Sequence, residues 1–383
     1  MKGTPLDTVL YFKNIDNAPA RRKLLGFGDF ARQEGWNIQI VPPNPSALAG
    51  LLDFWHPVGC VVNSASGWNN FSGADFAETP VVFIDRPPTA LRPCDSYVYH
   101  DATETVRLAM RELLVSPSAS YAYVSWPVDH DWNRERLDEF RAILGLHGRT
   151  GRVFTPACSL DDAMRLSREL AAWLAELPHP TAVLAAADPM GLQVLAACRL
   201  AGLHVPDEVS VIGIDNDEDI CETSIPALSS VSPDHRLAGW RAGEILKQLI
   251  ETRQTAPMRE TYGHVSFVRR GSTLRLKRKD GKVVEALEHI RRHAGEGLSA
   301  AEVFALFDCS RRNAEIRFRT AYGQSVMRAI HARRLEIAKE LLKSHGDLTF
   351  VAHNSGYSSA AALSHFFRKE TGLSPRAWRT RLG

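Results

Sequence analysis

Short apolar runs alternate with longer amphipathic segments from the start of the chain to about Ser266. The runs are nearly all apolar, which is typical of parallel strands that are covered by helices on both faces. They are Thr8–Phe12, Asn37–Val41, Gly59–Val62, Pro80–Ile84, Tyr121–Ser125, Ala182–Ala186 and Val209–Ile214. The segments with helical periodicity are Ala18–Glu34, Ala102–Val115, Arg134–Leu144, Asp161–Leu177, Met190–Ala201 and Arg236–Glu251. This order predicts an α/β fold with two parallel sheets, and hence two lobes with a cleft between them.

The remainder of the chain has a different pattern. After Val283, helical periodicity is interrupted only by Gly and Ser, and no strand-like run occurs. Between the two parts, the segment 269–282 carries seven basic residues and two glycines. We therefore predict a two-lobed α/β domain over residues 1–268, a basic linker over 269–282 and an all-α domain over 283–383.

The charge of the chain is unevenly distributed. The formal net charge is only +2, but residues 265–383 hold 23 Lys and Arg against 11 Asp and Glu, a balance of +12. Residues 1–264 therefore carry a balance of −10. A basic part joined to an acidic one indicates binding of nucleic acid or another polyanion, although a solvated basic surface is the alternative.

Several classes of protein are not indicated. The first residues do not resemble a secretion signal, no run of about 18 apolar residues occurs, and the six cysteines form no C-x-x-C pair. We expect a cytoplasmic protein with no membrane partner, no cofactor and no metal. Gly26, Gly28 and Ala31 fit the G-x-G-x-x-A dinucleotide pattern but fall late in a predicted helix, so a close helix crossing is the better interpretation.

The all-α part contains two helix-turn-helix patterns. In the first, a support helix near 299–306 and a turn at 308–309 precede a second helix, for which Ser310 is a good N-cap. Phe318 and Ile316 are expected to form a small core with Val303 and Phe307. The polar side chains expected to face DNA are Arg311, Arg312, Asn313, Glu315 and Arg319.

The second pattern begins at Leu348, turns at Gly356 and continues in a helix over 360–369. Phe350, Leu363 and Phe367 are expected to build its core. The alanines at 360–362 leave few groups for base contacts, and the available polar residues are Ser359, Ser364, His365 and Arg368. We expect the first module to read more bases and the second mainly to hold phosphate.

These modules resemble the AraC family of bacterial transcription regulators. The motifs that carry the resemblance are Arg334–Leu342, Gly356-Tyr357-Ser358, Leu363, Phe367, Gly372, Ser374-Pro375 and Trp378-Arg379. The resemblance covers about 100 residues. It implies two helices that enter successive major grooves of double-stranded DNA, about one helical turn apart.

The α/β part resembles the LacI-type sensor, which is itself similar to periplasmic sugar-binding proteins. The matching segments are Val211–Asp217, Leu228–Val231, Ala187-Asp188 and Trp132–Arg136. By motif, the resemblance places Trp132, Arg136, Asp188 and Asp215 in a ligand site, with Arg21 as a weaker candidate. Carboxylates and guanidinium groups suit the hydroxyls of a polyol, and an aromatic ring suits the apolar face of a sugar.

Each of these residues also has a structural interpretation. Asp215 could cap a loop, Asp188 could cap a helix, Arg136 and Arg21 could be surface arginines, and Trp132 could belong to the core. The segments 64–76 and 126–131 are expected to be rim loops that set ligand choice. Their Trp68, Asn69, Trp126 and His130 could line the cleft, as could residues near Arg21 such as Asn14, Asp16 and Asn17.

The combination implies a sugar-responsive transcription regulator, not an enzyme. The resemblance suggests an activator of a carbohydrate-utilisation operon, with xylose or a related sugar as effector, that works as a homodimer and contacts RNA polymerase. One alternative is a sugar-acting enzyme with a basic tail, for which no catalytic constellation is found. A transport-associated binding protein is the other, and the helix-turn-helix patterns speak against it.

Overall fold

A computed structural model describes residues 7–13, 17–42, 44–63, 73–85, 95–115, 118–252, 256–274, 280–344 and 347–380. The chain divides into two compact units, Met1–Thr273 and Leu274–Gly383, and each is described by itself. No helix in the described ranges is long and apolar enough to cross a membrane.

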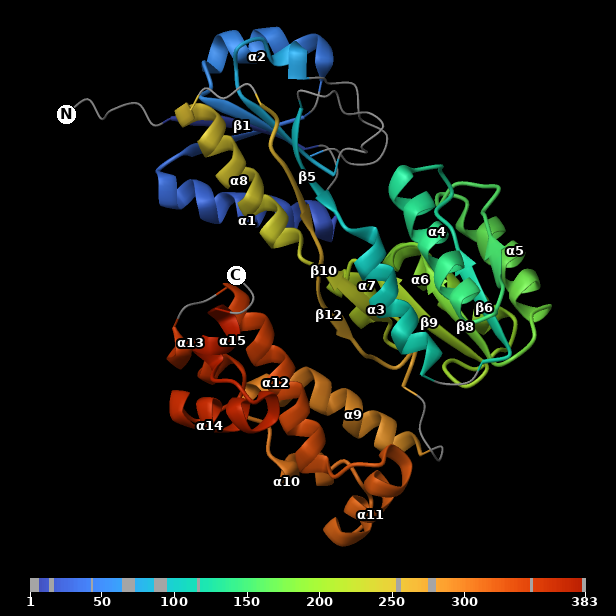
Figure 1. Cartoon of the computed structure of the whole chain (residues 1–383). Helices are drawn as coiled ribbons and strands as arrows, with labels where there is room; N and C mark the ends of the chain where they lie inside the picture. The colour runs from blue at the N-terminus through green and yellow to red at the C-terminus, as the bar shows by residue number, and fades with distance from the viewer. Residues whose placement is uncertain are drawn as a thin grey trace. The chain divides into compact units, whose positions relative to one another are not determined.

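The first lobe of unit 1 is built on a parallel sheet of six strands in the order β11-β5-β4-β3-β1-β2. The strands are β1 (Thr8–Phe12), β2 (Asn37–Val41), β3 (Gly59–Asn63), β4 (Val81–Ile84), β5 (Ser96–His100) and β11 (Arg259–Tyr262). Helices α1 (Ala18–Glu34) and α8 (His235–Thr252) cover one face (Figure 1), and α2 (Leu48–Trp55) covers the other. The apolar strands predicted here are present; β1, β3 and β4 are buried because both faces are covered, whereas the edge strand β2 is largely accessible.

The second lobe has a sheet in the order β12-β10-β9-β8-β6-β7, in which only β12 runs antiparallel to its neighbour within the described pairings. Its strands are β6 (Ser120–Val124), β7 (Gly151–Phe154), β8 (Thr181–Ala185), β9 (Val209–Ile214), β10 (Ser229–Pro233) and β12 (His264–Val268). Helices α3 (Ala102–Leu114) and α4 (Asp131–Leu146) pack on one face. Helices α5 (Ala163–Ala175) and α6 (Asp188–Leu200) pack on the other, and the short α7 (Glu218–Thr223) follows β9. The predicted α/β class is confirmed.

Helices α1 and α8 approach each other closely through glycines. A Cβ atom at Gly26 would overlap the carbonyl oxygen of Arg236, and one at Gly239 would overlap the carbonyl oxygen of Lys23. A side chain on either glycine would therefore force the backbones apart. Gly26 serves this crossing, as predicted, whereas Gly28 does not contact α8, and both lie within α1 and not in a dinucleotide-binding loop.

Three chain segments cross between the lobes side by side. They follow β5, β10 and β11, and each is flanked by a ring-bearing side chain: His100, His235 or Tyr262. The backbone amide of Asp101 donates to the carbonyl of Tyr262 at 2.8 Å, and that of Asp234 donates to the carbonyl of Gly263 at 2.9 Å. The crossovers are thus joined into one hydrogen-bonded hinge.

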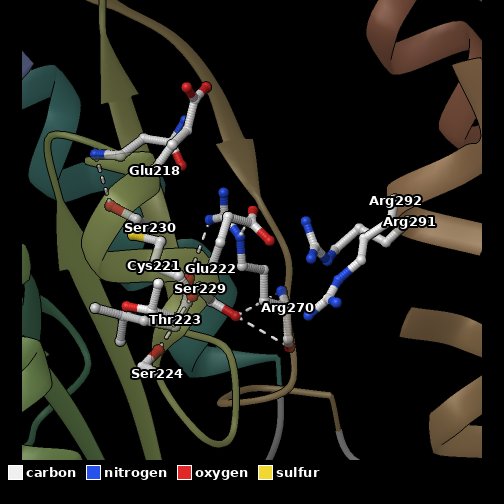
Figure 2. A network of polar contacts seen from close by, with 12 residues as sticks. Glu218, Cys221, Glu222, Thr223, Ser224, Ser229, Ser230, Arg270, Arg291 and Arg292 are labelled. Carbon is white, nitrogen blue, oxygen red and sulfur yellow. Dashed lines mark hydrogen bonds and ion pairs between the residues drawn. The ribbon is translucent and has the colours of Figure 1, made fainter. Parts of the chain in front are cut away.

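A buried arginine fastens the chain where it leaves the second lobe. The Arg270 guanidinium donates to Glu222 at 2.8 Å and to the carbonyl of Leu228 at 3.0 Å, and its backbone amide donates to Ser229 Oγ at 2.7 Å (Figure 2). Arg270 is buried, as is Ser272. The first residues of the predicted linker therefore pack onto unit 1, while residues 275–279 of that linker lie outside the described ranges.

Unit 2 is helical throughout the residues that the structure describes, as predicted. Its helices are α9 (Gly281–His293), α10 (Ala300–Phe304), α11 (Arg311–Tyr322), α12 (Val326–Ser344), α13 (Leu348–Asn354), α14 (Ala360–Thr371) and α15 (Pro375–Thr380). Helices α10 and α11 form the first helix-turn-helix, α13 and α14 form the second, and α12 joins them. Arg334 of α12 donates to the carbonyls of Ala294 and Leu298 at 3.1 and 2.8 Å.

The two modules use the same scaffold residues at a spacing of 49 positions. A serine caps α11 and α14, a phenylalanine of each helix is fully buried, an arginine follows it, and a glycine with positive φ ends the helix. The equivalent pairs are Ser310 and Ser359, Phe318 and Phe367, Arg319 and Arg368, and Gly323 and Gly372. Positions in one recognition helix can therefore be compared directly with positions in the other.

The predicted cores of the modules are confirmed except at two residues. Val303, Phe307, Leu363 and Phe367 are buried as expected. Ile316, however, is 53% exposed and Phe350 is 41% exposed, so their assignment to the cores is wrong. In α11 the core face is formed instead by Phe318 with Ala314 and Ala321, spaced four and three residues away, and Ile316 lies on the opposite side.

Candidate functional site

Unit 1 contains a cavity of about 460 Å³ between its lobes. Its lining is dominated by polar and aromatic side chains from both lobes. They include Asn17, Lys23, Asn63, Asp85, Tyr99, His100, Trp126, His130, Trp132, Arg136, Asp215, Asp217, His235 and Tyr262. Because the cavity lies beyond the carboxyl ends of parallel strands, it occupies the usual ligand position of open α/β sheets.

Arg136 and Asp215 form an ion pair in the wall of the second lobe. The guanidinium of Arg136 lies 3.5 Å from the Asp215 carboxylate, donates to the carbonyl of Ala186 and stacks on Trp132 at 4.8 Å from the ring centre. Burial alone would raise the pKa of Asp215, but Arg136 and His235 together hold it well below its usual range. The structure therefore brings together Trp132, Arg136 and Asp215, and the Asp215 carboxylate is ionised at the cavity.

The turn after β9 is held in an unusual conformation by the first lobe. Asp215 and Asn216 have φ values of 104° and 48°, in the left-handed region that non-glycine residues rarely adopt. Arg22 of α1 donates to both of their carbonyl oxygens, at 3.0 and 2.9 Å. Strain of this kind clusters at functional sites, where surrounding contacts maintain it. The neighbouring candidate Arg21 instead pairs with Asp219 at 3.6 Å and does not line the cavity.

A second charged pair lines the cavity from the first lobe. Lys23 of α1 pairs with Asp85, which follows β4, and the Tyr262 hydroxyl donates to the same carboxylate at 2.9 Å. Burial favours the neutral form of Asp85, but the adjacent Lys23 ammonium overrides this and lowers the pKa of Asp85. Each lobe therefore presents one ionised carboxylate to the cavity.

The hinge rings connect these two carboxylates. His235 lies 3.5 Å from Asp215 and contacts the Tyr262 hydroxyl at 3.2 Å, and Tyr262 in turn reaches Asp85. His100 stacks beside both rings at centroid distances of 6.4 and 5.2 Å. Burial, together with the nearby Arg136, lowers the pKa of His100 to about 3. The hinge is thus itself part of the cavity wall.

The lining has more hydrogen-bonding capacity than the protein itself uses. Buried atoms without a hydrogen-bond partner among the described residues include Asn63 Nδ2, Asp85 Oδ1, Arg136 Nε and Asp217 Oδ1. An unsatisfied buried polar atom costs about 1–3 kcal/mol, so such a set is expected where another molecule completes the bonding. Donors and acceptors are mixed, as a ligand with several hydroxyls requires.

Asp188, a predicted site residue, lies beneath the cavity. It is fully buried at the start of α6, does not belong to the lining, and accepts from Ser230 Oγ and the Asp217 amide at 2.6 Å each. Burial and the neighbouring Asp215 raise the pKa of Asp188 to about 8. Its contacts support the loop that carries Asp215 and Asp217, and it is not the helix cap, a position held by Ala187.

Of the other residues predicted to line the cleft, some line the cavity and the rest lie outside the described ranges. Trp126, His130 and Asn17 line the cavity. Trp68, Asn69, Asn14 and Asp16 lie outside the described residues. Those that sequence reasoning missed are Lys23, Asn63, Asp85, Tyr99, His100, Asp217, His235 and Tyr262. Most of them lie at the carboxyl end of a strand or within three residues after it, which is the signal that could have identified them.

In unit 2, the first recognition helix presents a basic surface. Ser310 accepts from the Asn313 amide at 3.4 Å and caps α11, as predicted. Arg312 and Asn313 are exposed, whereas Arg311 stacks on Phe304 at 5.2 Å. Arg319 is also exposed and pairs with Glu315 at 3.2 Å.

The second recognition helix offers fewer charges. Ser359 caps α14 through the Ala362 amide at 3.1 Å, so its side chain is engaged in the scaffold. His365 and Arg368 are exposed, and Ser364 is half-buried. In the described residues of either unit, no cluster of three or more His, Cys, Asp or Glu could hold a metal ion.

The chain matches two domain families. Residues 119–273 match the periplasmic binding protein-like domain, and residues 304–381 match a helix-turn-helix domain. The first match covers the second lobe apart from α3, together with α8 and β11 of the first lobe. The second begins at the last residue of α10 and covers α11, α12 and the whole second helix-turn-helix module.

Similar proteins extend over the whole chain. The xylose operon regulatory protein of Escherichia coli K12 is 27% identical over 378 residues, which cover 96% of this chain and 95% of that protein. The protein of the same name from Haemophilus influenzae is 25% identical and covers 74% of each chain. A solved structure of a xylose-binding transcription activator superposes with a TM-score of 0.62 at 24% identity and covers 99% of both chains. A transcriptional regulator in complex with cellobiose superposes on 70% of this chain with a TM-score of 0.59.

Proposed function

Since the chain is an AraC-type transcription regulator with a periplasmic-binding-protein-like sensor domain, we propose that a small carbohydrate in the cavity of unit 1 controls its action on DNA. The proposed effector is xylose or a related sugar. The family is one of regulators and not of enzymes, so the alternative of a sugar-acting enzyme is set aside.

The observation that carries this proposal is the polar lining of the cavity. Asp85 and Asp215 are ionised acceptors from opposite lobes, and each can accept hydrogen bonds from two hydroxyls of one polyol. Arg136 supplies donors, while the half-buried Trp132 and Trp126 offer apolar surface for a sugar ring. A volume of about 460 Å³ suits a small sugar with some water.

The ligand is proposed to act through the lobes and their hinge. A sugar that bonds Asp85 in one lobe and Asp215 in the other favours the arrangement in which both are close. It shifts the conformational equilibrium only by its difference in affinity for the two states. We further propose a cytoplasmic homodimer whose unit 2 domains bind two half-sites of double-stranded DNA, and an activator that contacts RNA polymerase. Residues 1–268 would be the sensor, 269–282 the linker and 283–383 the DNA-binding domain.

The proposed site residues are the candidates named from the sequence, and the roles of Asp188 and Arg21 are revised according to where the structure places them. Trp132, Arg136 and Asp215 are proposed to contact the ligand, with Asp188 supporting them and Arg21 outside the site. The proposed DNA-facing residues are Arg311, Arg312, Asn313, Glu315 and Arg319 in the first module, and Ser359, Ser364, His365 and Arg368 in the second.

A thermal-shift screen of the full chain with D-xylose, other pentoses and hexoses tests the proposal. A ligand that binds only the folded state raises the melting temperature by an amount that grows with the ratio of its concentration to its Kd. We expect one or a few sugars to do so, and expect Asp215→Ala to abolish the shift without impairing DNA binding. Asp53→Ala, an exposed change on α2, is the matched control. No shift with any sugar, or an unchanged shift in Asp215→Ala, would contradict the assignment of the site.

A further inference from the structure

The recognition helix α11 has an apolar residue at the centre of its outer face. Ala314, Phe318 and Ala321 point into the core of the module. The opposite face is formed by Arg312, Ile316 and Arg319, because residues three and four positions apart share one side of a helix. Ile316 is 53% exposed, so neither the module nor any other described part of the chain covers it.

Of the charged side chains around Ile316, one is held in place and one is free. Glu315 pairs with Arg319 at 3.2 Å, and its second oxygen accepts from the Val326 amide at 3.4 Å. Arg319 is therefore held against the helix, four residues from the Glu315 that orients it. Arg312 has no ion-pair or hydrogen-bond partner within the described ranges and is free to reach outward.

This combination fits the major groove of duplex DNA. Cations on both sides of an apolar centre complement two phosphate strands that flank the base edges. In that groove the 5-methyl group of thymine is the one apolar feature of the base edges, and it is read by apolar side chains. A surface for another protein would need a wider apolar area than the single Ile316 that α11 presents between two arginines.

We infer that Ile316 contacts the 5-methyl group of a thymine and makes the first module selective for that base. The inference rests on the proposed function, because it requires α11 to enter DNA. The equivalent position in α14, 49 residues later, is His365, which is a hydrogen-bonding residue. Arg312 is likewise matched by Ala361, whereas Arg319 is matched by Arg368. The two modules therefore share the arginine that suits a phosphate and differ at the other two positions of the outer face, 312 and 316 in the first module.

The test begins with DNA selected from a randomised duplex library by the full-length protein. In the selected site, each thymine is replaced in turn by deoxyuridine, which lacks only the 5-methyl group. We expect one replacement in the first half of the site to weaken binding about four-fold, the effect of one buried methyl group. In the Ile316→Ala variant, the same replacement should have no further effect.

The control is Val284→Ala, which removes methyl groups from another exposed position of unit 2 and should keep the full deoxyuridine effect. Because Ile316 is exposed, Ile316→Ala should leave the melting temperature unchanged. A deoxyuridine effect of equal size in wild type and Ile316→Ala overturns the inference while DNA binding itself stands. A change in oligomeric state of Ile316→Ala with unaltered base preference would also overturn it. Absence of any selected sequence would refute the proposed function as well.

Discussion

The guanidinium of Arg136 lies 3.5 Å from the carboxylate of Asp215, and both groups are largely shielded from water in the cavity wall. Breaking a buried ion pair from one side is costly because the remaining charge has no partner, whereas removing both charges is often neutral. The pair can therefore be tested without any ligand.

We expect Asp215→Asn to lower the free energy of unfolding by about 3 kcal/mol, since it leaves the Arg136 charge uncompensated. The double variant Arg136→Met with Asp215→Asn should recover most of this loss. Urea denaturation of the wild type, Asp215→Asn, Arg136→Met and the double variant measures the coupling. Additive effects of the two substitutions would show that the pair is not coupled.

The buried hinge histidine predicts a dependence of stability on pH. The pKa of His100 is lowered to about 3 in the folded protein, against about 6.5 in an unfolded chain. Between these values the unfolded state binds the extra proton, so stability from this group is complete above pH 6.5 and falls as the pH is lowered toward 3. His100→Gln should remove up to about 1.4 kcal/mol of the decline per pH unit.

The measurement compares unfolding free energies from pH 7 to pH 5 for wild type and His100→Gln. His147→Gln, at an exposed position after α4, is the control and should follow the wild-type curve. A curve for His100→Gln that runs parallel to wild type would refute the role of this ring.

Two glycines of one helix should respond oppositely to the same substitution. At Gly26 a methyl group would overlap the backbone of α8, so Gly26→Ala should destabilise unit 1 by about 3 kcal/mol. At Gly28 the nearest atoms would lie 3.8 Å from the added Cβ, an ordinary contact. Gly28→Ala should therefore be neutral or stabilise by up to about 1 kcal/mol through helix propensity.

Differential scanning calorimetry of both variants measures this contrast. The sugar response serves as a second readout, because α1 also carries Lys23 and Arg22. Equal melting temperatures for Gly26→Ala and Gly28→Ala would argue against the close crossing.

Substitutions of two arginines of α11 should affect different properties: one should change DNA affinity and the other the stability of unit 2. Arg312 has no partner in the described residues, whereas Arg317 donates to Asp280 at 2.8 and 2.9 Å and stacks on Phe307. Arg312→Ala should weaken DNA binding and leave the melting temperature unchanged. A base contact would relax selectivity at one position, and a phosphate contact would reduce the salt slope by about one.

Arg317→Ala should have the opposite profile and lower the melting temperature of unit 2. Fluorescence anisotropy over a range of salt concentrations, with specific and scrambled duplexes, distinguishes these outcomes. Unchanged affinity and selectivity in Arg312→Ala would remove this residue from the DNA interface.

The sequence identified most of the sheet because its central strands are apolar on both faces. It missed β5, β7, β10, β11 and β12, because these strands are not continuous apolar runs. The strand β5, Ser96–His100, contains serine, two tyrosines and histidine, and β11, Arg259–Tyr262, lies at the edge of its sheet, where polar residues are tolerated. Both strands end in cavity residues, so missing them also concealed His100 and Tyr262.

The cavity lining was predicted where family motifs suffice and missed where distant segments meet. Arg136 and Asp215 lie in segments that match the LacI-type sensor. Lys23, Asp85 and His235 come together only because three separate segments converge, and no local pattern encodes that. The sequence analysis also chose Arg21, whereas Arg22 is the arginine that binds the turn after β9. Successive helix residues point about 100° apart, so the choice between neighbours decides which one reaches the site.

The scaffold of the DNA-binding modules was easier to predict than their surfaces. Ser310 has the capping role expected of it, whereas Ser359, which was expected only to face DNA, also caps its helix. Ile316 and Phe350 were assigned to cores because they are apolar, yet helical position decides burial, and both face outward. The exposure of Ile316 is informative because this residue lies on the outer face of α11, between Arg312 and Arg319.

The crossovers at His100, His235 and Tyr262 both join the two lobes and line the cavity. A molecule bound beside these rings acts on the segments about which the lobes of unit 1 rotate. A molecule bound only at the far ends of the lobes would act at a distance from that axis. A displacement of a fraction of an ångström at a pivot grows with distance along each lobe. A ligand in the cavity would then lie directly against the residues about which the two lobes turn.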